Sequence, residues 1–144
     1  MYSFQASIHA RPHGAVTGKV IALAQGVYQT LAIVPGDIPS LPVSFEQAAE
    51  ALSALDRLYF EPDGSFVWVS ASTAAPWQLD GVLYDRDGRL QYAEVRGACP
   101  AEAFNLLLKA LGWPGAPLMF QLRLEAVHLG EDEFRRYAVA TASV

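Results

Sequence analysis

Residues 60–69 read FEPDGSFVWV and residues 84–93 read YDRDGRLQYA, and each stretch holds an Asp-Gly pair inside an apolar frame. In the first stretch, Pro62 presets the φ angle of one central turn position and Gly64 supplies the positive φ that closes two strands. The second stretch works in the same way without the proline. Together they predict two β-hairpins in a four-stranded meander over Leu58–Glu61, Ser65–Ser70, Trp77–Tyr84 and Arg89–Arg96.

A calcium loop is the alternative interpretation of these acidic turns. Asp85 and Asp87 begin like such a loop, but Gly88 comes too early, and no glutamate stands at the twelfth position to bind the ion with both oxygens. We therefore expect the loops to turn the chain, and we predict no metal ion here.

The second strand of the meander carries apolar side chains on both faces. Phe66 and Trp68 share one face, while Val67 and Val69 line the other. Strands buried on both sides have this composition. The pattern predicts a central strand that is covered on both faces.

The rest of the chain adds strands and helices around the meander. Tyr2–Ala10 alternates apolar and polar residues with a period of two, and Ser44 with Gln47 forms the capping-box pattern of a helix start. Residues 118–128 alternate like one long strand, with His128 on the side of Phe120, although a helix is the other possibility. Further elements are a hairpin of Lys19–Gln25 with Tyr28–Val34, a helix from Pro100 to Gly112 and a final helix over Glu131–Ala140.

These elements predict an α+β fold in a single domain of residues 1–144. Its sheet is mainly antiparallel, with about seven to eight strands including the hairpin meander near 58–96, and about three helices pack on one face. A chain of 144 residues that is 52% hydrophobic has ample apolar surface for a core of its own.

Composition and charge exclude several classes of function. The formal net charge of −5 and the scattered basic residues argue against nucleic acid, because such binding depends on clustered lysine and arginine. No apolar run is long enough to span a membrane, and the first residues lack the pattern of a secretory signal. We therefore expect a cytoplasmic protein without nucleic-acid or membrane partners.

The candidate catalytic residues are Cys99, His9 and His13. Cys99, the single cysteine, precedes a predicted helix start, where the helix dipole would stabilise a reactive thiolate, but an inert buried thiol is the alternative. His9 and His13, together with His128, titrate near neutral pH, yet they do not form a zinc pattern if His128 faces the apolar side. We predict neither a metal nor a cofactor.

Carboxylates and aromatic residues supply two further hypotheses. Asp80, Asp85, Asp87 and Glu94 either hold an acid–base pair or are ordinary surface acids of hairpins. Aromatic side chains provide contact area with a polar group, so they form either a binding surface or part of the core. The candidate binding residues are Trp68, Trp77, Tyr84, Tyr92 and Trp113.

The sequence holds none of the common motifs for phosphate loops, dinucleotide binding, nucleophile elbows or zinc proteases. We therefore expect a non-catalytic module for protein interaction or self-assembly, with a homodimer as its simplest form. The alternative is a small-molecule-binding protein or small enzyme, with a pocket between sheet and helices that uses Cys99 or a histidine.

Overall fold

The computed structural model describes residues 1–142 and contains nine strands and three α-helices in that range. The strands form one antiparallel sheet in the order β2-β3-β9-β8-β1-β7-β6-β5-β4. This confirms the predicted α+β class and the antiparallel sheet. The strands are β1 (Tyr2–Ala10), β2 (Val16–Leu23), β3 (Gly26–Ala32), β4 (Leu58–Phe60), β5 (Ser65–Val69), β6 (Gln78–Arg86), β7 (Arg89–Cys99), β8 (Leu118–Leu122) and β9 (Val127–Gly130).

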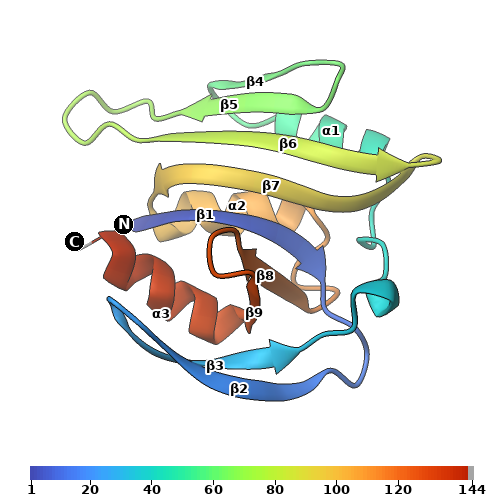
Figure 1. Cartoon of the computed structure of the whole chain (residues 1–144). Coiled ribbons are helices and arrows are strands. Elements are labelled where there is room, and N and C mark those ends of the chain that lie inside the picture. The colour runs from blue at the N-terminus through green and yellow to red at the C-terminus, as the bar shows by residue number, and fades with distance from the viewer. Residues whose placement is uncertain (143–144) are drawn as a thin grey trace.

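The three helices, α1 (Phe45–Ser53), α2 (Ala101–Ala110) and α3 (Glu131–Ala142), pack on the same face of the sheet. The ring of Phe4 on β1 meets Phe104 of α2 and Phe134 of α3 edge to face, each at 5.4 Å between centroids. Figure 1 shows α1 and α2 behind the meander and α3 beside β1 and β3. A short 3₁₀ helix, η1 (Pro35–Asp37), lies between β3 and α1.

Local signals place the helix starts. The Oγ of Ser44 accepts from the backbone N–H of Gln47 at 3.1 Å, and the Gln47 side chain accepts from the Ser44 backbone at 2.9 Å. These two bonds form the predicted capping box and satisfy donors that a helix start leaves free. Pro100 is the N-cap of α2 rather than its first helical residue, one position from the prediction.

The core lies between the sheet and the helices. Phe120 of β8 stacks on Phe134 of α3 at 4.3 Å between centroids, and Phe104 of α2 lies 5.9 Å from each of them. All three rings are fully buried. Aromatic contacts of this kind stabilise a fold by more than the burial of their surface area alone would. This cluster therefore fixes α2 and α3 against the middle of the sheet.

The long strand predicted over residues 118–128 is wrong, because the chain reverses within it. β8 ends at Leu122, a turn follows, and β9 begins at Val127, while Leu124 in the turn is 90% exposed. In this hairpin His128 pairs with Gln121, an odd-numbered residue, so its side chain lies on the opposite face from Phe120. The predicted position of His128 on the apolar side is therefore also wrong.

The predicted double coverage of the strand at Ser65–Val69 is wrong as well. β5 lies next to the edge strand β4, and only its Phe66 and Trp68 face is buried against the core. Val67, on the other face, is 38% exposed because no helix of residues 1–142 covers that side. Within the same residues, no helix is long and apolar enough to cross a bilayer.

Candidate functional site

The face of the sheet opposite the helices, called here the open face, carries a row of aromatic rings. Tyr84 of β6, Tyr92 of β7 and His9 of β1 are direct cross-strand partners, with ring centroids 4.7 Å and 5.0 Å apart. The ring centroid of His128, on β9, lies 6.0 Å from that of His9. These four residues, the aromatic row, come from β1, the β6–β7 hairpin and β9, three segments far apart in sequence that the sheet order brings together.

Exposure to solvent falls along the aromatic row from Tyr84 to His9, and His128 beyond it is half-buried. Tyr84 is 39% exposed, whereas only 7% of His9 reaches solvent. Burial, and secondarily the nearby His128, lowers the pKa of His9 to about 4, although a hydrogen bond with the Gln121 side chain opposes this shift. Burial also lowers the pKa of His128. Both imidazoles are therefore neutral near neutral pH, because the buried environment disfavours their charged form.

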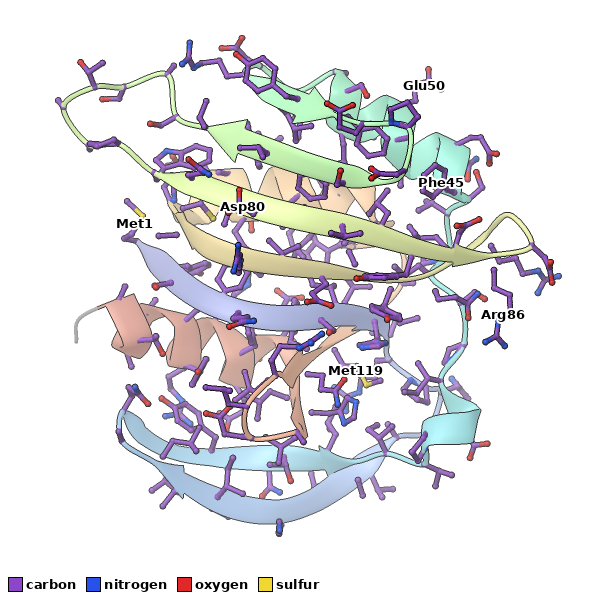
Figure 2. The ribbon with its side chains drawn as sticks, turned by 45° about the horizontal axis from the view of Figure 1, so that its top comes forward. Met1, Phe45, Glu50, Asp80, Arg86 and Met119 are labelled. Carbon is purple, nitrogen blue, oxygen red and sulfur yellow. The ribbon has the colours of Figure 1, made fainter. Side chains whose placement is uncertain are left out.

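Two ion pairs flank the aromatic row on the same face. Arg96 of β7 lies 3.8 Å from Asp80 of β6, and the Arg123 guanidinium donates to Glu94 at 2.5 Å. Three of these groups, Asp80, Glu94 and Arg96, border a shallow groove of about 470 Å³ over β5, β6 and β7. Figure 2 marks Asp80 on this side of the sheet.

The structure divides the four carboxylates that the sequence suggested for acid–base chemistry. Asp80 and Glu94 lie on the open face, and each is paired with an arginine. Asp85 and Asp87 lie at the exposed end of the β6–β7 hairpin, where Asp87 takes a φ of 53° in the turn. The turn interpretation accounts for these two residues, since aspartate tolerates the left-handed conformation.

The candidate catalytic residues are separated from one another. Cys99 is fully buried at the end of β7, and burial raises the pKa of its thiol to about 12. His13 lies in the exposed turn after β1 and borders a separate cavity of about 460 Å³ near η1. Of the three residues, only His9 lies on the open face, so the structure does not assemble them into one site.

The five predicted binding aromatics lie in two places. Trp68 and Trp77 meet edge to face at 5.2 Å on the helix side, and the Trp113 indole N–H donates to Glu131 at 2.7 Å. Only Tyr84 and Tyr92 belong to the open face. The three tryptophans therefore serve the core and its margin.

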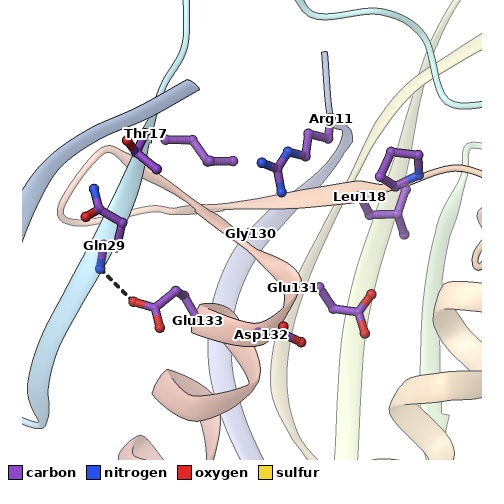
Figure 3. A pocket seen from close by; sticks show the side chains of 10 residues that line it. Arg11, Thr17, Gln29, Leu118, Gly130, Glu131, Asp132 and Glu133 are labelled. Carbon is purple, nitrogen blue, oxygen red and sulfur yellow. Dashed lines mark hydrogen bonds between the residues drawn. The ribbon is translucent and has the colours of Figure 1, made fainter. Parts of the chain in front are cut away.

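A second candidate cavity lies at the start of α3. It has a volume of about 420 Å³, and Figure 3 shows the Arg11 side chain directed into it above Gly130. Glu131 accepts from Trp113 and Arg135, and Glu133 accepts from the Gln29 backbone and Arg136, so both acids are engaged within the fold. Arg11 and Asp132 make no side-chain hydrogen bond or ion pair with the residues of 1–142.

Sequence reasoning missed two residues of the open face, Met119 and Gln121, and it placed His128 on the wrong face. Met119 stands directly opposite His9, and Gln121 stands opposite both Ser7 and His128. The signal that identifies them is the parity of the β8–β9 hairpin, which becomes visible only once the turn is known.

Comparison with known proteins finds no matching family model, no matching curated protein and no matching solved structure. The open face combines the aromatic row and two arginine–carboxylate pairs near its middle with exposed aliphatic side chains on its outer strands. Aromatic residues and arginine are enriched in protein interfaces. The arrangement is suited to holding a partner surface.

Proposed function

We propose that this protein is a non-catalytic self-assembly module that forms a homodimer through the open face of its sheet. The observation that carries the proposal is the distribution of exposed apolar side chains. Five of the eleven large exposed ones in residues 1–142 lie on this face, which no helix of that range covers. They are Val20, Val27, Tyr59, Val67 and Tyr84.

The charges of the open face favour a second copy of this chain as the partner. The chain carries a net charge of −5, so two copies repel each other over most of their surfaces. On the open face, however, Asp80 and Glu94 are balanced by Arg96 and Arg123. A copy related by a twofold axis presents the same four charges, which allows each arginine to face a carboxylate of its partner.

Sedimentation velocity over a wide concentration range tests this proposal. We expect the wild-type protein to dimerise and Tyr84→Ser to weaken the dimer at least about tenfold, or about 1.4 kcal/mol. Leu106→Ser is the matched control, since Leu106 is similarly exposed at 42% but lies on α2, on the other side of the sheet. A protein that stays monomeric at millimolar concentration overturns the proposal, and so does a dimer weakened equally by both substitutions.

Small-molecule binding in the cavity at the start of α3 is the second candidate function. Arg11 and Asp132 both line this cavity of about 420 Å³, and neither has a side-chain partner in the described chain. A guanidinium and a carboxylate on the walls of one cavity suit a small zwitterion, such as an amino acid. Calorimetric titration with a panel of amino acids tests this candidate, with Arg11→Met expected to abolish any heat of binding.

A further inference from the structure

Three potential metal ligands lie on neighbouring strands at the histidine end of the aromatic row. His9 is on β1, Met119 on β8 and His128 on β9, which are neighbouring strands of the sheet. Met119 is the direct cross-strand partner of His9, and it lies diagonal to His128 because Gln121, two residues on, is the partner of His128. Side chains in such direct and diagonal positions reach one another on one face of a sheet. Figure 2 marks Met119 near the end of β1.

Both imidazoles present nitrogens that the fold does not use. The Nε2 atoms of His9 and His128 are buried and have no hydrogen-bond partner. A neutral imidazole with a lone pair on Nε2 is the form that binds metals, so both unpartnered nitrogens are available as ligands.

The spacing of the two rings fits a shared ion. Their centroids lie 6.0 Å apart, with an angle of 66° between the ring planes. With metal–nitrogen bonds of about 2.0–2.1 Å, two imidazole centroids on one ion lie about 5–6 Å apart, depending on the angle at the metal. The observed separation of the two ring centroids lies within this range.

The chemistry of the three groups selects the ion. Two imidazoles and the thioether of the fully buried Met119 are all neutral donors, and thioethers favour Cu(I) over harder cations. No carboxylate belongs to this trio, and the Arg11 guanidinium lies beside Gly130, 3.3 Å from where a Cβ would stand. Burial costs a divalent ion more than a monovalent one when no negatively charged ligand compensates its charge. The nearby Arg11 guanidinium adds to this difference, so the site favours a monovalent ion.

We propose that His9, Met119 and His128 form a binding site for one Cu(I) ion on the open face of the sheet. The site goes beyond self-assembly and does not depend on it, because its ligands all come from one chain. Cu(I) would be held by the Nε2 atoms of the two imidazoles and by one thioether sulfur.

The experiment uses the whole chain labelled with ¹³C in the methionine methyl groups. The sequence has only two methionines, Met1 and Met119, so the spectrum holds two methyl signals that Met119→Leu assigns. We expect one equivalent of Ag(I), a redox-inert substitute for Cu(I), to shift the Met119 signal and leave that of Met1 in place. An unchanged Met119 signal overturns the proposal.

Affinity for Cu(I) itself is measured without oxygen, by competition with a chromophoric Cu(I) chelator. We expect one ion per chain, with Met119→Leu and His128→Asn each weakening binding at least about tenfold. Met119→Leu nearly preserves volume and keeps the core packed. His13→Asn and Cys99→Ala are controls and should leave affinity unchanged, because His13 lies in an exposed turn and Cys99 is buried on the helix side. Equal affinity of wild type, Met119→Leu and His128→Asn overturns the site, and so does loss of binding in either control.

Discussion

The Glu133 carboxylate accepts a hydrogen bond from the backbone N–H of Gln29 at 2.6 Å, although the two residues are 104 positions apart in sequence. Figure 3 shows this bond between the first turn of α3 and strand β3. Arg136, one turn further along the helix, donates to the same carboxylate at 3.0 Å and to the carbonyl of Val27 at 2.7 Å. These contacts tie α3 to the outer hairpin of the sheet.

We predict that Glu133→Gln destabilises the protein in a pH-dependent way. Burial raises the pKa of Glu133, but the bonds from Gln29 and Arg136 outweigh it, so the net pKa lies below the ordinary 4.5. The carboxylate therefore contributes stability above about pH 4.5, and this is lost as the pH falls through the lowered pKa. At neutral pH the free energy of unfolding in urea should fall by about 1–2 kcal/mol, because the hydrogen bonds from Gln29 and Arg136 no longer reach a charged group. Once the pH falls below this lowered pKa, the difference in stability from wild type should become small.

Asp132→Asn is the control for this prediction, because Asp132 stands in the same turn without a side-chain partner in residues 1–142. Its effect at neutral pH should stay below about 0.5 kcal/mol. A difference between wild type and Glu133→Gln that stays constant from neutral to acidic pH would show that the carboxylate charge plays no part.

We predict that Gly81→Ala destabilises the sheet through a single clash. A Cβ at Gly81 would overlap the ring of Phe66 on the neighbouring strand β5. Urea unfolding should show a free energy of unfolding that is about 1–3 kcal/mol lower than that of wild type, as for other overpacked cores. Adding Phe66→Leu shortens the clashing side chain, so a double-mutant cycle should give a favourable coupling of about 1 kcal/mol or more.

Gly36→Ala is the matched control, because no atom lies within 4 Å of a Cβ at Gly36 in η1. It should be neutral or stabilise by about 0.5 kcal/mol, since alanine reduces the freedom of the unfolded chain. Strictly additive effects of Gly81→Ala and Phe66→Leu would contradict the clash.

Sequence patterns predict the structure well where the residues that determine a feature lie within a few positions of one another. The alternation over Tyr2–Ala10 gave β1 with its observed bounds, and Ser44 with Gln47 gave the start of α1. The Asp-Gly pairs gave the hairpin turns of the meander. Each of these features depends on the chain near its own position, so a local pattern contains it.

The hairpin of β8 and β9 shows where a local pattern fails. Its turn, residues 123–126, holds neither glycine nor proline, and Ala126 takes the positive φ of 57° that glycine would normally take. Without turn residues, the alternation over 118–128 reads as one strand, and the face of every later residue is inverted. The position of His128 was wrong for this reason.

The aromatic row was beyond sequence reasoning for a different reason. Its members lie on β1, β6, β7 and β9, and β8 stands between two of them in the sheet. Which strands are neighbours depends on pairings between distant segments, and periodicity within each segment does not contain this information. The sequence therefore proposed Tyr84 and Tyr92 as binding residues but grouped them with three tryptophans on the opposite face.

We predict that Ser44→Ala destabilises the protein by about 1 kcal/mol. The substitution removes the oxygen that accepts from the Gln47 N–H and leaves a donor of the first turn without its partner. Thermal unfolding should show a lower Tm, and Ser44→Asp should restore most of it because aspartate also caps helices. Ser53→Ala, at the exposed end of the same helix, is the control and should shift Tm little. Equal shifts for both alanine variants would contradict the capping role.

We predict that Cys99 resists alkylation in the native protein. Burial raises the pKa of its thiol from 9.0 to about 12, which lowers the reactive thiolate fraction about a thousandfold near pH 8, and the closed core further excludes the reagent. Iodoacetamide labelling followed by mass spectrometry should therefore be very slow in buffer and fast in urea, where the chain is unfolded. Because Cys99 is the single cysteine, the mass increase reports this residue alone. Rapid labelling of the folded protein would reveal an accessible thiolate at the start of α2 and would favour a reactive role for Cys99.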